Sequence, residues 1–153
     1  MLIRTHIAVA VFVGFLLLNF VSDPAFFFIS VVVVTFIPDL DSFNSKIGKK
    51  FFSRVLTAFT KHRGIMHSFL FMILAYFVLY FYFKIISFGF LVGYGTHLVC
   101  DSVTRQGIRI FYPFKFKIRG LLKTGGKFES FLFLIFSLAD IFMTFKIVFQ
   151  SIF

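Results

Sequence analysis

The stretch HRGIMHSFLFMILAYFVLYFYF, residues 62–83, joins a basic, polar segment to a long apolar run. It holds two of the chain's four histidines, His62 and His67, directly before the apolar run that begins at Phe69. Ionisable side chains at or within a membrane segment are costly, and they usually serve a function. This junction therefore predicts a membrane protein in which imidazoles gather at one face of the membrane.

Composition places the chain among membrane proteins. Its 153 residues suffice for one domain, 1–153, and 59% of them are hydrophobic, with a mean hydropathy of +0.98. The net charge of +10 would suggest nucleic acid in a soluble protein. In a membrane protein, the positive-inside rule and anionic lipids explain it, so membrane lipids are the expected partners and nucleic acid is not. The single cysteine, Cys100, excludes an intramolecular disulfide, and nothing in the sequence predicts an oligomeric state.

The apolar segments predict an all-α, polytopic helical bundle with four or five spans. The segment at 25–37 is shorter than the ~20 residues of a typical span, so it is either a thin or tilted span or a re-entrant hairpin. Apolar residues at i+4 spacing in 43–63 predict an amphipathic helix lying in the membrane interface. Lys84 and Ser87-Phe88-Gly89 predict a tight turn, while Gly93 and Gly95 would permit close helix packing. The five apolar segments are 3–21, 25–37, 68–83, 90–103 and 131–152.

The distribution of charge predicts which side of the membrane carries the site. If all five segments cross, then every Lys and Arg except Lys84 and Lys146 lies on one side. The positive-inside rule assigns this side to the cytoplasm. The same topology, chosen by charge alone, brings most of the ionisable residues of interest to that side. We therefore expect a protein of the cytoplasmic membrane with a cytoplasm-facing site, and the residues brought together are His6, Asp39, Asp41, His62, His67, His97, Asp101 and Glu129.

These residue types suit divalent metal ions. His97 and Asp101 are an i, i+4 pair on one helix face, able to bind one cation or bridge two, or else to form a hydrogen bond that packs helices. Asp39 and Asp41 repel each other unless a cation joins them. Imidazole and oxygen ligands make Zn²⁺ the first choice, with Mn²⁺ or Fe²⁺ as alternatives and two or three ions in all. The predicted ligands are His6, Asp39, His62, His67, His97 and Asp101.

The ligand set and its basic neighbours predict hydrolysis of a phosphoester by metal-activated water. Arg63, Arg105 and Lys127 are the predicted contacts of an anionic, phosphate-containing substrate, which is a lipid or a lipid-linked molecule. Asp41 or Glu129 would act as general base or acid. The alternative is a non-enzymatic scaffold that binds metal or lipid. A metal carrier is disfavoured, because few polar residues lie near the middle of the spans.

The order of motifs resembles the YdjM-like inner-membrane family, whose members are expected to be metal-dependent hydrolases. The resemblance covers nearly the whole chain, and its most specific part is the block from His62 to Ser68. Met66 stands where that family usually has Thr. The matching motifs are Thr5-His6…Gly14, Pro38-Asp39-Leu40-Asp41, His62-Arg63-Gly64-Ile65-Met66-His67-Ser68, His97-x-x-x-Asp101 and Gly125-Gly126-x-x-Glu129.

That family is in turn similar to zinc-dependent phospholipase C and the related single-strand nucleases. Those enzymes are all-α, hold three zinc ions and use a His-x-x-x-Asp helix pair. The resemblance therefore implies phospholipase C-like chemistry and places the pair at His97 and Asp101. The further positions that it implies are His6, Asp39 and His67, followed by Asp41, His62 and Glu129.

Overall fold

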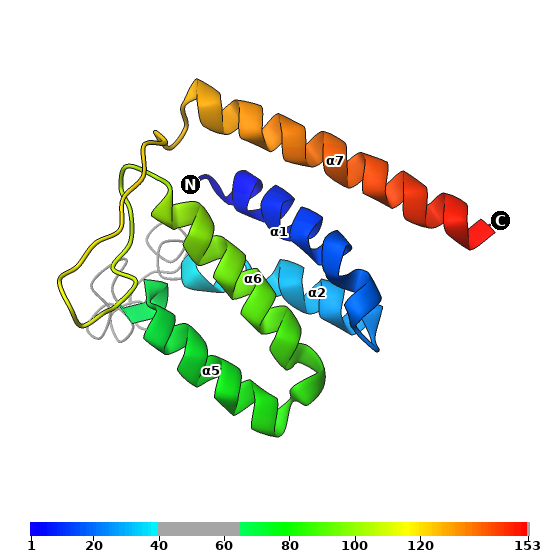
Figure 1. Cartoon of the computed structure of the whole chain (residues 1–153), viewed down its shortest axis with the longest axis horizontal. Helices are drawn as coiled ribbons and strands as arrows, with labels where there is room; N and C mark the ends of the chain where they lie inside the picture. Colours follow the sequence, from blue (N-terminus) through cyan, green and yellow to red (C-terminus); the bar gives the residue numbers. More distant parts are fainter. Residues whose placement is uncertain (40–64, 153) are drawn as a thin grey trace, which may run out of the picture.

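The computed structural model describes residues 1–39 and 65–152, and the regular secondary structure within these ranges is helical (Figure 1). Residues 104–122 fold back on themselves through two isolated β-bridges, and the described residues contain no strand. Short 3₁₀ turns η1 (Leu18–Phe20), η2 (Ile37–Asp39) and η3 (Ile65–His67) adjoin the main helices. The α-helices are α1 (Ile3–Leu17), α2 (Pro24–Val34), α5 (Phe69–Tyr82), α6 (Lys84–Ser102) and α7 (Lys127–Ile152).

Local signals in the sequence explain where two of these helices begin. Ser68 is the N-cap of α5: its Oγ accepts a hydrogen bond from the Phe71 N–H at 3.2 Å and donates one to the Ile65 carbonyl at 2.6 Å. Pro24 opens α2, a position where its missing N–H costs no hydrogen bond. Ser68 therefore fixes the direction in which the chain leaves His67.

Close packing of α2 against α6 corrects one prediction. Ser87-Phe88-Gly89 is not a turn, because α6 already begins at Lys84. A Cβ atom on Gly89 would lie 1.7 Å from Ser30 Oγ, and one on Gly93 would lie 2.4 Å from the Val31 carbonyl oxygen. These glycines let two helix backbones approach each other, as predicted for Gly93. A Cβ on Gly95 would make only an ordinary contact, 3.9 Å from Met72 Sδ.

Among the residues that the structure describes, three helices are long and apolar enough to cross a membrane: Ile3–Phe20, Lys84–Ser102 and Lys127–Gln150. The apolar helices Pro24–Asp39 and Phe69–Tyr82 are shorter. The all-helical membrane fold is thus confirmed with three candidate spans, while four or five spans stay a prediction. The predicted interfacial helix at 43–63 falls entirely within 40–64, outside the described residues. Helix α7 starts at Lys127, ahead of the predicted segment 131–152, and presents large exposed apolar side chains along its length, as expected of a lipid-facing helix.

The ends of the helices explain how the site assembles. Figure 1 shows that the starts of α1, α5 and α7 and the ends of α2 and α6 all lie at one end of the bundle. Helix α7 packs along α1, where Arg4 Cζ lies 5.1 Å from the centre of the Phe133 ring. The predicted gathering of polar residues at one end is therefore confirmed for the described residues. That this end faces the cytoplasm remains a prediction.

Candidate metal centre

Five ionisable side chains meet at this end of the bundle. His6 comes from α1, Asp39 from η2, His67 from η3, and His97 and Asp101 from α6. His6 Nε2 lies 3.3 Å from Asp101 Oδ1, and His67 Nε2 lies 3.7 Å from Asp101 Oδ2. Asp39 Oδ1 lies 3.6 Å from His67 Nε2 and 3.8 Å from His97 Nε2. Apart from Asp39, whose side chain is 22% exposed, these groups are at most 1% exposed.

The spacing of these atoms fits ligands around a metal ion. Nitrogen–oxygen hydrogen bonds measure roughly 2.7–3.2 Å, and all four distances exceed that range. Two N or O ligands held about 2.0–2.2 Å from one tetrahedral zinc ion stand about 3.3–3.6 Å apart. Within the described residues, Nδ1 and Nε2 of His67 and Nε2 of His97 are buried ring nitrogens that make no hydrogen bond. Buried polar atoms of this kind are normally satisfied, and a cation bound at this point would satisfy them.

The backbone of α2 orients the His97 ring. Its Nδ1 lies 2.9 Å from the Thr35 carbonyl oxygen. A carbonyl can only accept, so Nδ1 carries the proton and Nε2 keeps its lone pair directed toward the cluster. The His6 ring stacks on His97 with centroids 4.0 Å apart and planes at 6°. The second imidazole is thereby held parallel to the first.

The cluster forms one shared centre rather than two separate ones. Ligand atoms of His6, Asp39 and His97 lie within 4.8 Å of one another, and so do those of His67, His97 and Asp101. His97 belongs to both groups, yet its Nδ1 is already hydrogen-bonded, so its Nε2 can serve only one ion. Asp101 presents Oδ1 to one imidazole and Oδ2 to another. Both oxygens of this carboxylate therefore face imidazoles of the cluster, so Asp101 could contribute to holding a metal there.

Glu129 ties two chain segments together beside this cluster. It is 1% exposed; its Oε1 accepts from the Leu2 N–H at 2.5 Å and its Oε2 from the Gly125 N–H at 2.5 Å. The adjacent Met1 amine contacts Asp101 Oδ1. With both oxygens bonded to backbone amides, Glu129 holds the start of α1, and hence His6, against the start of α7. This geometry favours a positioning role for Glu129. Its action as general acid or base stays a prediction.

The remaining predicted residues lie outside the cluster or outside the described chain. Arg105 Nε donates to the Leu121 carbonyl at 3.1 Å, which braces the loop, and its side chain is exposed. Lys127 is exposed at the first position of α7. Their role in binding substrate stays a prediction. The predictions for Asp41, His62 and Arg63 fall in residues 40–64, which the structure does not describe.

Two supporting residues were missed by sequence reasoning. Thr35 supplies the carbonyl that orients His97, and the Tyr94 hydroxyl donates to the Met66 carbonyl, which anchors the turn carrying His67. Helical spacing offered a signal for Tyr94, which stands three residues before His97. Thr35 acts through its backbone carbonyl, which no side-chain spacing marks.

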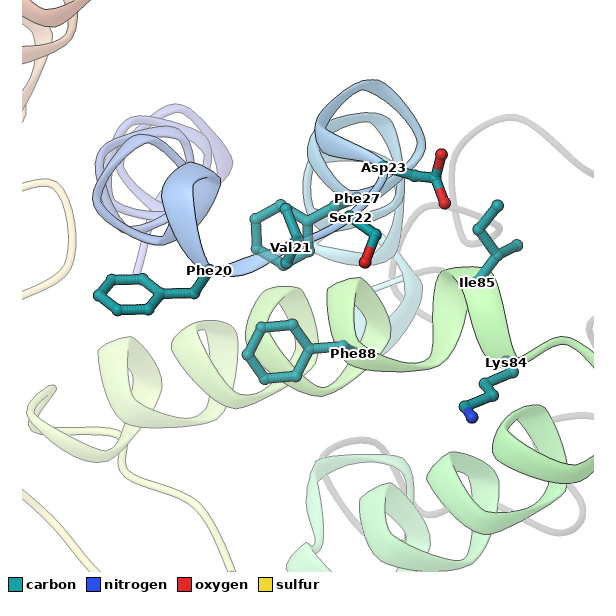
Figure 2. Close-up of a pocket in the computed structure, with 8 residues that line it drawn as sticks. All are labelled: Phe20, Val21, Ser22, Asp23, Phe27, Lys84, Ile85 and Phe88. Carbon is teal, nitrogen blue, oxygen red and sulfur yellow. The ribbon is translucent and has the colours of Figure 1, made fainter.

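A separate cavity of about 500 Å³ opens at the opposite end of the bundle. Figure 2 shows its lining, from the turn between α1 and α2 and from the start of α6. Along α6, Lys84 and His97 are roughly 20 Å apart at 1.5 Å per residue, so the cavity is remote from the cluster. Its charged lining residues, Asp23 and Lys84, are both exposed. Neither presents the buried, unsatisfied atoms that mark the candidate metal centre.

Fold and site together define a helical membrane protein with a buried centre of imidazoles and carboxylates at one end of its bundle. The chain belongs to the YdjM inner membrane protein family, whose model matches residues 1–151. It is 37% identical over 114 residues to the "Uncharacterized protein YvsG" of Bacillus subtilis (strain 168), covering 71% of each chain. No solved structure matches the chain. The resemblance expected from the motifs is thus confirmed at the level of the family.

Proposed function

We propose that this protein is a membrane-bound, metal-dependent hydrolase that cleaves a phosphoester of a lipid or lipid-linked molecule. The observation that carries the proposal is the buried cluster in which His6, His67 and His97 direct Nε2 toward Asp39 and Asp101 at 3.3–3.8 Å. Burying Asp101 and three imidazoles at the end of a membrane bundle, with the partly exposed Asp39 beside them, is costly. A cation-binding role accounts for that cost.

The five clustered side chains would hold the metal, which we propose to be two or three Zn²⁺ ions, with Mn²⁺ or Fe²⁺ as alternatives. Bound there, such ions would polarise a phosphoryl oxygen and acidify water. The chain supplies their placement. Thr35 fixes the tautomer and direction of His97, and Glu129 holds the segment carrying His6. Asp101, which faces two imidazoles, would contribute a carboxylate to the bound metal.

Substrate binding would fall to cations at the same end of the bundle. Lys127 and Arg105 are exposed there, and Arg63 precedes the turn that carries His67. Guanidinium and ammonium groups suit a phosphate, the former through paired hydrogen bonds. The charge asymmetry favours the cytoplasmic side of the membrane for this end. Asp41 or Glu129 would exchange protons with water and the leaving group, and the amide contacts of Glu129 make Asp41 the preferred candidate.

The proposal is tested by turnover of purified, full-length protein stripped of metal and reloaded with Zn²⁺, Mn²⁺ or Fe²⁺. Substrates would be phosphatidic acid, phosphatidylcholine, a soluble phosphomonoester and an oligonucleotide. We expect hydrolysis of a lipid substrate by reloaded protein only, and none by Asp101→Asn. Asp23→Asn, at the opposite end of the bundle, is the matched control and should retain wild-type rates.

The second candidate is a non-enzymatic scaffold that binds metal or lipid. The partial exposure of Asp39, at 22%, favours the enzyme, because a reacting group needs access to the ions whereas a closed structural site does not. Metal bound in stoichiometric amounts without turnover across the whole panel would establish the scaffold and overturn the hydrolase.

A further inference from the structure

An apolar pocket of about 260 Å³ lies at the start of α5, at the end of the bundle that holds the candidate metal centre. One wall is the first part of α5, and the other is the loop that follows α6. Two contacts hold this loop against α5 and α6. The Phe69 N–H donates to the Ile110 carbonyl at 2.7 Å, and Ile108 of the same loop is fully buried in a core cluster with Tyr94. The lining residues are Phe69, Leu70, Ile73, Phe111, Tyr112, Pro113 and Phe114.

The pocket and the cluster are neighbours along the chain. His67 stands two residues before Phe69, so their Cα atoms are at most roughly 7 Å apart. A molecule bound with its phosphate at the cluster would therefore have its apolar part within reach of this pocket. The volume falls just below the roughly 300–1,000 Å³ of pockets that hold whole drug-sized ligands. It suits a slender apolar segment.

The loop that forms one wall of the pocket carries exposed cations and aromatic side chains in alternation. Arg109 and Lys115 flank the lining residues of the loop, and both are exposed. Phe114 and Phe116 are 72% and 62% exposed, and Leu121 is 88% exposed. Aromatic and aliphatic side chains interleaved with Lys and Arg are typical of segments that enter a membrane interface and contact anionic head groups. This charge pattern favours an anionic lipid over a protein as the occupant.

We infer that this pocket binds an acyl chain of an anionic phospholipid and so aligns the lipid's phosphate with the histidine–aspartate cluster. The inference rests on the proposed function, since it identifies the substrate as a lipid with its chain in the pocket. Arg109 and Lys115 select the anionic head group. The apolar walls accept the chain without leaving a polar atom unsatisfied.

The test uses metal-stripped, full-length protein in phosphatidylcholine vesicles that contain phosphatidic acid with a diazirine in one acyl chain. Metal removal prevents turnover, so labelling reports binding alone. We expect cross-links mapped by mass spectrometry to concentrate on residues 69–73 and 111–114. Each basic residue near the surface adds about fivefold to the anionic preference, so the same diazirine on phosphatidylcholine should label the pocket at least about fivefold less.

Two tryptophan variants supply the matched pair. Leu70 lines the pocket, and its side chain is 52% exposed. The larger side chain of Leu70→Trp should fill the pocket and abolish most of its labelling. Leu74→Trp, also on α5 and 58% exposed, does not line the pocket and should label like wild type. Lys115→Gln should lower the preference for the anionic lipid about fivefold.

Labelling spread evenly along the apolar surface of α7 and α5, or unchanged by Leu70→Trp, would overturn the inference. Equal labelling by both lipids would overturn the anionic assignment. Failure of metal binding alongside pocket-specific labelling would instead reject the proposed hydrolase and leave the lipid site intact, so the two failures can be told apart.

Discussion

The two ends of the helical bundle differ in where their polar atoms lie. At one end, His6, His67, His97 and Asp101 are almost fully buried, with Nε2–oxygen distances of 3.3–3.8 Å. At the other end, a cavity of about 500 Å³ has only the exposed Asp23 and Lys84 as charged lining. Water or head groups can solvate exposed charges at little cost, whereas buried ones require a partner. We therefore place the candidate functional site at the buried polar atoms rather than at the larger cavity.

The largest expected effect is the loss of one carboxylate from the cluster. Asp101→Asn keeps the shape but removes the negative charge that faces two imidazoles. Loss of a supporting partner outside the ligand shell already costs about 10–100-fold in metal affinity or activity, so loss of a ligand should exceed about 100-fold. Isothermal titration of Zn²⁺ and the rate of lipid hydrolysis measure it.

Asp23→Asn is the control from the opposite end and should leave both quantities unchanged. Equal effects of the two substitutions would remove the contrast between the ends, because a general loss of negative charge would then explain the result.

Glu129→Gln tests whether Glu129 positions the cluster or takes part in the reaction. An amide would keep one acceptor but oppose the second backbone N–H with its own NH₂ group, at a cost of about 1.5–3 kcal/mol. If Glu129 positions the start of α1, then the melting temperature and the Zn²⁺ affinity should both fall. An intact affinity combined with a large loss of kcat would instead identify Glu129 as the acid or base.

Gly93→Ala tests the close packing of α2 against α6. The added Cβ would lie 2.4 Å from the Val31 carbonyl oxygen, a backbone atom that cannot move aside easily. Overpacking of this kind costs about 1–3 kcal/mol, and thermal unfolding in detergent should register it. In Gly95→Ala the new atom meets only Met72 Sδ at 3.9 Å, so a change below about 0.5 kcal/mol is expected. Similar melting temperatures for the two variants would contradict the packing of α2 on α6.

Tyr94→Phe should produce the smallest effect. It removes the hydroxyl that donates to the Met66 carbonyl, and such a hydrogen bond contributes about 1 kcal/mol. We expect a Zn²⁺ affinity lowered by about tenfold, since the turn carrying His67 loses its anchor. Tyr80→Phe, on an exposed part of α5, is the control and should leave Zn²⁺ affinity as in wild type. Identical affinities for both variants would place the anchoring of His67 elsewhere.

The gathering of the ionisable residues was predictable, because charge asymmetry and the order of apolar segments place them at one end. The i, i+4 spacing likewise predicted that His97 and Asp101 share a face. The start of α6 was predicted wrongly, since a glycine within an apolar run serves helix packing or a turn equally well in sequence, and only the contact of Gly89 with Ser30 distinguishes them. The Thr35 carbonyl that orients His97 is a backbone group in another helix, so no side-chain pattern could reveal it.

The most direct test of a metal centre at the buried end is the metal content of purified, full-length protein by inductively coupled plasma mass spectrometry. Wild-type protein should carry two or three zinc ions per chain, or the same number of manganese or iron ions. The double variant His97→Ala with Asp101→Ala should lose them, while Asp23→Ala with Lys84→Ala should keep them. Equal stoichiometry in all three proteins, or a wild-type protein that binds no divalent metal on reloading, would contradict the account.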